Sequence, residues 1–156
     1  MLDGYISDLE PGDVLRTIEY ELTDLIVSEY AHGVEDATEF FHSDQTALGG
    51  QARTPTAAHV DKMRVLEESC TKERRIAGNN AADWRIHYEF EVENLSPAFV
   101  GERLRVEGRV LDVYTKRGRR FVHFEFTTST TDGRPVSILR DRTLLRYEPE
   151  TEGSDG

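Results

Sequence analysis

The sequence predicts an α+β fold in which a strongly curved antiparallel sheet wraps around a central helix. Two helical segments occupy the first half of the chain, and four strand-like segments fill the region from about residue 84 to residue 147. Turn residues separate those later segments, which indicates an antiparallel meander. At 156 residues, the chain has the length of one such domain.

The first half begins with an extended lead-in, residues 1–13, and a strand. Over residues 15–22, polar and apolar side chains alternate, which predicts a half-buried strand. Thr23 can cap a helix that ends near residue 34, and the helix dipole favours Asp24 in its first turn. Four residues are expected to form the apolar side of this helix: Leu25, Ile26, Tyr30 and Val34.

An irregular stretch, residues 43–56, leads into a second helix. Its Gly49-Gly50 pair allows a tight turn or a close approach of the backbone to a ligand. Pro55 suits the first turn of a helix from about Thr56 to Cys70. The residues of this helix expected to contact the rest of the fold are Ala57, Val60, Met63, Arg64 and Leu66. Residues 77–83 are expected to form a surface loop.

The second half is predicted to be almost entirely β. In its first strand, four apolar residues at alternate positions should share one face: Ile86, Tyr88, Phe90 and Val92. His87 occupies a polar position of the same strand and is expected to face solvent. A bulge is expected near Gly108, because the parity of the apolar residues changes there. Turns near residues 116–119 and 131–135 connect the remaining strands.

The charge is distributed unevenly. The net charge is −11, and residues 1–50 carry twelve acidic side chains and one basic side chain, Arg16. This balance argues against nucleic-acid binding, because neutralising phosphates needs a basic surface. The mildly basic region 51–147 is compatible with a phosphorylated small ligand or an acidic carrier protein.

We expect one domain, residues 1–147, followed by an acidic and disordered tail, residues 148–156. The chain starts without the basic and apolar regions of a signal peptide, and none of its apolar runs is long enough to cross a bilayer. Its single cysteine, Cys70, excludes an internal disulfide and fits a reducing compartment. These features predict a cytoplasmic protein without membrane association.

Several groups of residues, taken in order, resemble a known family. They are Tyr30-Ala31 with Asp36 six residues after the tyrosine, Gly49-Gly50 with Thr54-Pro55-Thr56, Ile86-His87-Tyr88 leading to Pro97 and Gly101, residues 108–118, and residues 142–147. With these groups in order, the chain resembles the hotdog fold and, within it, the MaoC-like (R)-specific enoyl-thioester hydratases and dehydratases. It is most similar to the dehydratase-type half-domains that also occur in mesaconyl-CoA hydratase-like proteins.

The resemblance also implies a site. The active motif of the family runs Gly-Asp-x-Asn-Pro-apolar-His, and Asp36 matches its aspartate. Phe41 stands at the histidine position, and His42 is the next residue. A one-residue bulge would bring His42 inward. The glycine, asparagine and proline positions hold Glu35, Thr38 and Glu39.

This site implies hydration or dehydration of an acyl thioester. Asp36 and His42 would hold a water molecule, one of them would remove its proton, and the oxygen would add to the β-carbon of an enoyl thioester. Backbone N–H groups of Gly49-Gly50, or of the helix that begins near Thr56, would bind the thioester carbonyl. Neither a cofactor nor a metal is expected. The substrate-binding residues expected are Thr38, Phe41, Gly49, Gly50, Thr54, Pro55 and Thr56.

Three functions are compatible with these residues. The first is a hydratase or dehydratase acting on a thioester of CoA or acyl carrier protein. The second is a non-catalytic hotdog subunit that shapes an acyl tunnel for a catalytic partner of the same fold. The third is a thioesterase, in which a helix-borne acid activates water. Hotdog subunits usually pair through their sheets, so the resemblance implies a homodimer or a heteromer with another hotdog subunit.

Overall fold

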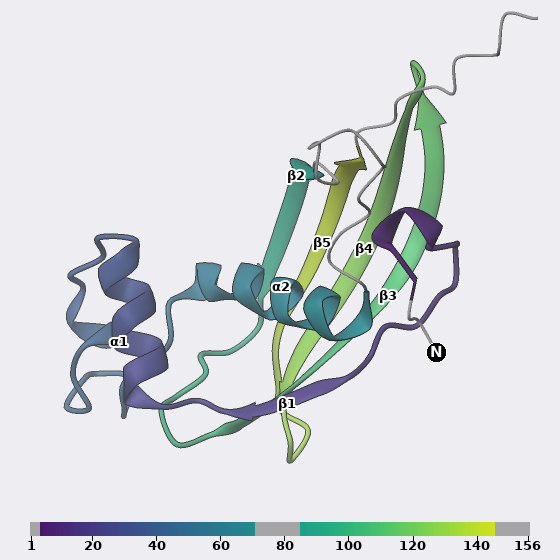
Figure 1. The fold of residues 1–156 in the computed structure, drawn as a ribbon. Helices are drawn as coiled ribbons and strands as arrows, with labels where there is room; N and C mark the ends of the chain where they lie inside the picture. The colour runs from purple at the N-terminus through teal and green to yellow at the C-terminus, as the bar shows by residue number, and fades with distance from the viewer. Residues whose placement is uncertain (1–3, 71–84, 146–156) are drawn as a thin grey trace, which may run out of the picture.

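Five antiparallel strands form one sheet, and helix α2 crosses one of its faces (Figure 1). The computed structural model describes residues 4–70 and 85–145. The strand order in the sheet is β1-β3-β4-β5-β2. In chain order, the elements are η1 (Ile6–Asp8), β1 (Ile18–Glu21), α1 (Asp24–Gly33), η2 (Glu39–Phe41), η3 (Pro55–Ala57), α2 (Ala58–Ser69), β2 (Arg85–Asn94), β3 (Arg103–Lys116), β4 (Arg119–Thr130) and β5 (Pro135–Leu145).

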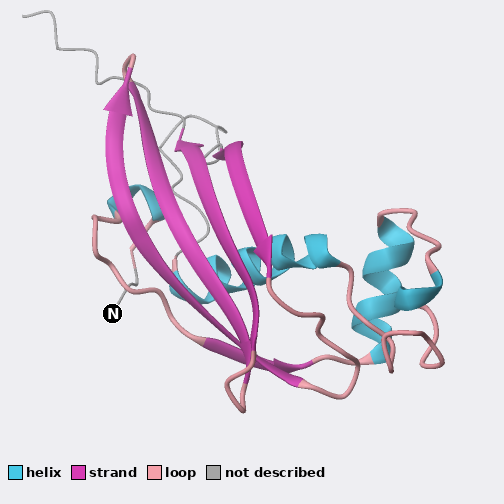
Figure 2. Ribbon diagram, turned by 180° about the vertical axis from the view of Figure 1, so that it is seen from behind, coloured by secondary structure: helices cyan, strands magenta, loops and turns pink. Residues whose placement is uncertain are grey.

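Helix α2 is the central helix that the sequence predicts. It packs against β3, β4 and β5, and Figure 2 shows it across the curved sheet while α1 stands beside one end of the sheet. Pro55 begins η3, directly ahead of α2, where a missing backbone N–H costs no hydrogen bond. The structure therefore confirms the α+β class and the sheet curved around a helix.

Helix α1 begins as predicted but buries a different side. The Thr23 hydroxyl accepts a hydrogen bond from the Ile26 N–H at 3.3 Å, so the predicted cap is present. Val27 and Ala31 are buried, whereas Leu25 is 68% exposed and Val34 is 49% exposed. The predicted apolar side is wrong for Leu25 and Val34, because α1 meets the rest of the fold through the side that carries Val27.

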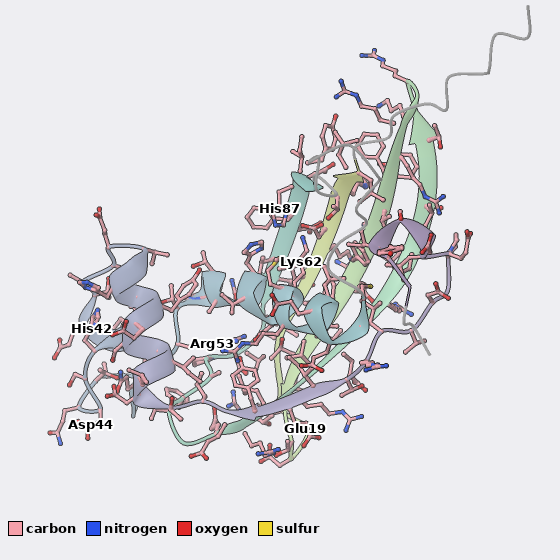
Figure 3. All side chains as sticks on the ribbon, viewed as in Figure 1. Glu19, His42, Asp44, Arg53, Lys62 and His87 are labelled. Atoms are coloured by element: carbon pink, nitrogen blue, oxygen red, sulfur yellow. The ribbon has the colours of Figure 1, made fainter. Side chains whose placement is uncertain are left out.

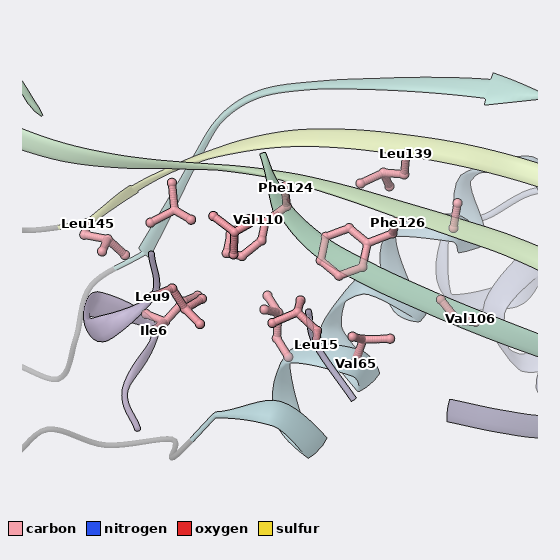
Figure 4. Close-up of a cluster of buried hydrophobic side chains, with 13 residues drawn as sticks. Ile6, Leu9, Leu15, Val65, Val106, Val110, Phe124, Phe126, Leu139 and Leu145 are labelled. Atoms are coloured by element: carbon pink, nitrogen blue, oxygen red, sulfur yellow. The ribbon is translucent and has the colours of Figure 1, made fainter. Parts of the chain in front are cut away.

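Two clusters of buried apolar side chains connect these elements. The larger cluster fills the space between α2, the N-terminal lead-in and the sheet (Figure 4) and includes Leu15, Val65 and Phe126. The smaller cluster joins α1 to the end of the sheet, and its members are Leu22, Val27, Ala98, Leu104 and Val136. Burial of each large apolar side chain contributes about 1.5–3 kcal/mol.

The bulge in β3 lies further along the strand than the sequence predicts. The register of β3 on β4 shifts between Val110 and Asp112, not at Gly108. Gly108 instead lies against an aromatic ring: a Cβ at this position would be 2.8 Å from ring carbons of Phe126. The parity of the apolar residues does change within this strand, as predicted. Glycine at position 108 serves a different purpose, because a side chain there would collide with the Phe126 ring.

A second bulge, between His87 and Glu89, changes the faces of β2. The Tyr88 ring packs beside that of Phe121 at 5.1 Å, whereas the His87 ring lies 5.9 Å from that of Phe90 and contacts the buried residue Asp141. The prediction of one apolar face on this strand is therefore wrong. His87 is exposed as expected, but its ring also contacts the buried carboxylate of Asp141. The expected loop 77–83 and the expected tail 148–156 lie outside the described residues.

Candidate functional site

The turn after α1 carries the expected acid. The Asp36 N–H donates to the Ala31 carbonyl at 2.9 Å, which closes the end of the helix. Glu35, in place of the motif glycine, has a φ of +57°. A side chain thus occupies a left-handed backbone position that glycine adopts with the least strain.

Asp36, Thr38 and His42 lie on this one turn. The Asp36 carboxylate accepts the Thr38 N–H at 3.0 Å. Hydrogen bonds from the Thr38 side chain and N–H hold the pKa of Asp36 below its ordinary value. The His42 imidazole is exposed, and its Nε2 lies 2.7 Å from the Asp36 backbone oxygen. His42 therefore bonds to the main chain, and the Asp36 carboxylate bonds to Thr38.

Phe41 occupies the more enclosed position. Its ring is half-buried and packs against the smaller apolar cluster. Together with Phe40, Leu48 and Pro55, it lines a pocket of about 370 Å³ that reaches the start of β5. We call this the lower pocket. The residue at the motif's histidine position thus provides apolar pocket surface.

Gly49 and Gly50 both form hydrogen bonds with Thr46 of the same loop. Gly49 has a φ of +85°, and its N–H donates to the Thr46 carbonyl at 3.0 Å. The Gly50 carbonyl accepts the Thr46 hydroxyl at 2.7 Å. A Cβ at Gly50 would be 3.2 Å from the Phe99 ring. The two glycines allow a tight turn and close packing.

A second pocket, of about 230 Å³, lies between β1, α1 and α2. We call it the upper pocket. Thr54 lines it, and the Tyr30 hydroxyl at its edge bonds to the Thr56 hydroxyl at 2.9 Å. The predicted Thr54-Pro55-Thr56 segment therefore separates two pockets, with Thr54 on the upper and Pro55 on the lower one.

The upper pocket is also lined by buried charged residues, which the sequence did not predict as part of a site. Arg53 Nη1 lies 2.6 Å from Asp61 Oδ2 and 2.9 Å from the Tyr20 hydroxyl. The Tyr20 hydroxyl donates to Asp61 Oδ1 at 2.6 Å, and Thr128 donates to Oδ2 at 3.1 Å. Burial and the negative charge of Asp61 raise the pKa of Tyr20, so this hydroxyl remains a donor. Although burial lowers the pKa of Arg53, Asp61 raises it further, and the guanidinium stays charged.

A second buried pair lies one residue further along α2. Lys62 Nζ is 2.8 Å from Asp141 Oδ2, and both side chains are almost completely buried. His87 Nδ1 reaches the same carboxylate oxygen at 2.6 Å, and Thr143 donates to Oδ1 at 2.5 Å. Figure 3 shows Arg53 and Lys62 beside α2, with His42 on the far side of α1. The two networks form the polar centre of the fold.

These networks explain why the second helix shows an irregular apolar stripe. Asp61 and Lys62 are buried, whereas Met63 is 36% exposed, so the predicted contact position Met63 is wrong. The available signal was the Asp61-Lys62 pair on the side of the helix that carries Ala58 and Val65. Their partners, Arg53 and Asp141, come from separate parts of the chain.

We also searched the described residues for metal-binding groups and for helices that could span a membrane. Residues 4–70 and 85–145 contain no group of three or more histidine, cysteine, aspartate or glutamate side chains arranged to hold a metal ion. No helix in these two ranges is both long and apolar enough to span a bilayer.

Comparison with known proteins identifies the fold. No protein-family model and no curated protein matches the sequence. Among solved structures, a MaoC-like dehydratase from Rhodospirillum rubrum has a TM-score of 0.69 and 20% identity, covering 93% of this chain and 98% of the other. The HadBC complex of Mycobacterium tuberculosis, a (3R)-hydroxyacyl-ACP dehydratase, has a TM-score of 0.71 and 14% identity, covering 90% of this chain and 100% of the other.

The (R)-hydratase PhaJ1 of Pseudomonas aeruginosa is a further neighbour, with a TM-score of 0.69 and 13% identity, covering 91% of this chain and 85% of the other. The structural neighbours are thus MaoC-like dehydratases and (R)-hydratases, and the chain has their hotdog fold. The hotdog resemblance of the sequence is confirmed at the level of the fold.

Proposed function

We propose that this chain serves as a substrate-binding hotdog subunit of an acyl-thioester hydratase or dehydratase, in which a second hotdog subunit supplies the acid–base pair. One observation carries the proposal: Phe41 lines the lower pocket at the motif's histidine position, while His42 is exposed and bonds to the backbone of Asp36. A general base must reach the proton it removes. A carboxylate whose pKa is lowered is also a weaker base.

The lower pocket supports the binding role. Its lining is mostly apolar, with Phe40, Phe41, Leu48 and Val136 among its residues, and it has the volume for a short acyl chain. The thioester and its carrier, CoA or acyl carrier protein, would remain outside in solvent. We place this function in the cytoplasm, in keeping with the single cysteine.

The partner in this proposal is another hotdog chain. Strand β2 lies at one edge of the described sheet. An exposed edge strand offers unpaired N–H and C=O groups to a neighbouring strand. The neighbour HadBC is itself a complex, which supports a two-subunit arrangement for this chain.

A self-sufficient hydratase is the second candidate. It is favoured by the placement of Asp36, Thr38 and His42 on one turn, with 2.7 Å between His42 Nε2 and the Asp36 backbone oxygen. Rotation of the imidazole towards the carboxylate would then form the pair.

Hydration of crotonyl-CoA by the isolated chain tests the choice between the two. The loss of enoyl absorbance is measured for wild type, Asp36→Asn and His42→Ala. We expect all three to leave crotonyl-CoA unchanged. Hydration by wild type that either substitution abolishes would establish the self-sufficient enzyme instead. Release of free thiol would indicate a thioesterase.

Binding of crotonyl-CoA, measured by calorimetry, tests the pocket separately. Leu48 is 42% exposed and lines the lower pocket, so Leu48→Glu should weaken binding at least tenfold by placing a charge against the acyl chain. Leu25→Glu is the matched control, because Leu25 is 68% exposed on α1 and lines neither pocket. Equal binding by the two variants would contradict the assignment of the lower pocket.

A further inference from the structure

The upper pocket has an apolar wall and takes no part in the proposed function. This wall is formed by Leu22, Ile26, Val27, Ala57 and Val60. The volume of the pocket is about 230 Å³, whereas an apolar cavity of about 150 Å³ already holds a benzene molecule. The upper pocket therefore has room for an apolar body of that size together with a small polar group.

Arg53 presents an unused edge of its guanidinium group at this pocket. Nη1 donates to Asp61 Oδ2 at 2.6 Å and to the Tyr20 hydroxyl at 2.9 Å. Within residues 4–70 and 85–145, Nε and Nη2 have no hydrogen-bond partner. Neither nitrogen is among the fully enclosed polar atoms that lack a partner, so both remain accessible to a ligand.

The position of the guanidinium assigns this edge to the upper pocket. Arg53 lines both pockets, but its partners Asp61 and Tyr20 line the upper pocket and not the lower one. Figure 3 shows Arg53 between β1 and the first turns of α2. A ligand in the upper pocket can therefore reach the free side of the guanidinium.

This arrangement suits a carboxylate. The N–H groups of Nε and Nη2 are parallel, and this edge of an arginine binds a carboxylate through two hydrogen bonds. Thr54 also lines the pocket, and its Oγ1 is enclosed without a hydrogen-bond partner among the described residues. Buried polar groups normally have such a partner. A carboxylate in the pocket would accept hydrogen bonds from Arg53 and Thr54 and would satisfy both.

The charges around the pocket favour a ligand with one negative charge. Asp61 balances Arg53, and both of its carboxylate oxygens already accept hydrogen bonds. The Arg64 guanidinium lies 4.5 Å from the centroid of the Tyr20 ring and forms no ion pair within the described part of the chain. Glu29, the other acidic residue at the pocket, is exposed to solvent. Arg64 thus leaves one positive charge that a single carboxylate would compensate.

From these contacts we infer that the upper pocket binds a small monocarboxylic acid with an apolar body. Arg53 and Thr54 hold the carboxylate, Arg64 lies beside it, and the apolar body packs against Val27 and Val60. This site is separate from the lower pocket, so the inference goes beyond the proposed function. Its test depends neither on hydration nor on thioester binding.

Benzoate is the probe, and benzamide is its neutral isostere. Both are titrated into the full chain by calorimetry. We expect one benzoate per chain with a dissociation constant of about 0.1–1 mM, as is usual for a ligand of this size. Benzamide should bind at least about tenfold more weakly, because it lacks the charge that strengthens hydrogen bonds to a guanidinium. The absence of binding at about 10 mM benzoate, or equal binding of the two compounds, would overturn the inference.

Arg64→Gln tests the charge at the pocket. Because Arg64 is only partly buried, the variant should fold, and it should bind benzoate about threefold to tenfold more weakly than wild type. Arg119→Gln is the matched control, since Arg119 is exposed at the start of β4 and lines neither pocket. Equal benzoate binding by the two variants would contradict the site.

Thr54→Val separates binding from stability. Removing an unpartnered buried hydroxyl should leave the midpoint of urea unfolding unchanged or raise it, whereas benzoate should bind about threefold more weakly. Ser7→Ala removes another enclosed, unpartnered hydroxyl, in η1, and should not affect binding. Leu48→Glu alters the lower pocket and should bind benzoate as wild type does. Unchanged binding by Thr54→Val, or a loss of binding in Leu48→Glu, would place benzoate elsewhere and overturn the inference.

Discussion

The charged side chains between α2 and the sheet differ from those in residues 35–50 in their burial and in their bonding partners. Asp61 and Asp141 are 1% and 0% exposed, and each is bonded to a buried basic residue. In residues 35–50, Asp36 accepts a bond from a neighbouring threonine, and the exposed His42 bonds to the main chain. One region encloses paired charges, and the other presents single polar groups at the surface.

This difference separates residues that hold the fold from residues free to serve a ligand or a partner. Removing one partner of a buried ion pair leaves an uncompensated charge in a medium of low dielectric constant. Exposed polar groups exchange their protein contacts for water with little change in free energy. Substitutions in the buried networks should therefore change stability far more than substitutions in residues 35–50.

The largest effect is expected for Asp141→Asn. Lys62, whose side chain is 3% exposed, would remain buried and lose its 2.8 Å ion pair with the Asp141 carboxylate. We expect the free energy of unfolding to fall by about 3–5 kcal/mol, measured by urea denaturation. Asp44→Asn, at an exposed position in residues 35–50, is the control and should change stability by less than about 0.5 kcal/mol. If both substitutions lowered the free energy of unfolding equally, the proposed difference between buried and exposed charges would be contradicted.

Gly108→Ala should have the next largest effect. The added Cβ would lie 2.8 Å from ring carbons of Phe126 and 3.0 Å from Leu15. Overpacking of this kind costs about 1–3 kcal/mol. Gly33→Ala, in α1, has no atom within 4 Å of the new Cβ and should be neutral or stabilising. Thermal unfolding of both variants measures the difference, and a loss at Gly33 equal to that at Gly108 would contradict it.

Glu35→Gly should stabilise the protein. The φ of +57° at Glu35 is strained for a side chain, and relief of that strain exceeds the entropy cost of glycine by about 0.5–1 kcal/mol. Chemical denaturation tests the sign. The control Ala37→Gly, on the same turn, should reduce stability, and a gain there would point to a general effect of flexibility.

The smallest effect concerns pH. Burial, with the positive charges of His87 and Lys62, lowers the pKa of His59 below 6.5 in the folded state. The unfolded chain therefore binds a proton first as the pH falls, and this contribution to stability is present above pH 6.5 and lost below it. His59→Gln should reduce the loss of stability between neutral and mildly acidic pH. His123→Gln should act in the same direction, because burial and Arg142 lower the pKa of His123. A steeper loss in either variant would contradict the assignment.

The sequence was sufficient for the fold because its signals were local. Alternating residues in the second half, the Thr23 cap and Pro55 at the start of a helix each follow from neighbouring residues. Together they predicted the curved antiparallel sheet around α2, which the structure and its hotdog neighbours confirm.

The buried networks could not be predicted in the same way. Asp61 pairs with Arg53 and Tyr20, and Lys62 pairs with Asp141, so each network joins segments that only the tertiary fold brings together. The bulge between His87 and Glu89 likewise depends on the pairing of β2 with β5. For Asp36 and His42, the sequence predicted one shared turn, but the bonding partners depend on backbone geometry.

The most direct test of the proposed role exchanges two adjacent residues. Phe41→His/His42→Phe keeps the composition and places the imidazole at the half-buried position that Phe41 occupies beside the lower pocket. Hydration of crotonyl-CoA by the isolated chain is the measurement. We expect no turnover by wild type and measurable turnover by the exchanged variant. Turnover by wild type that the exchange abolishes would show instead that His42, where it stands, is the catalytic base.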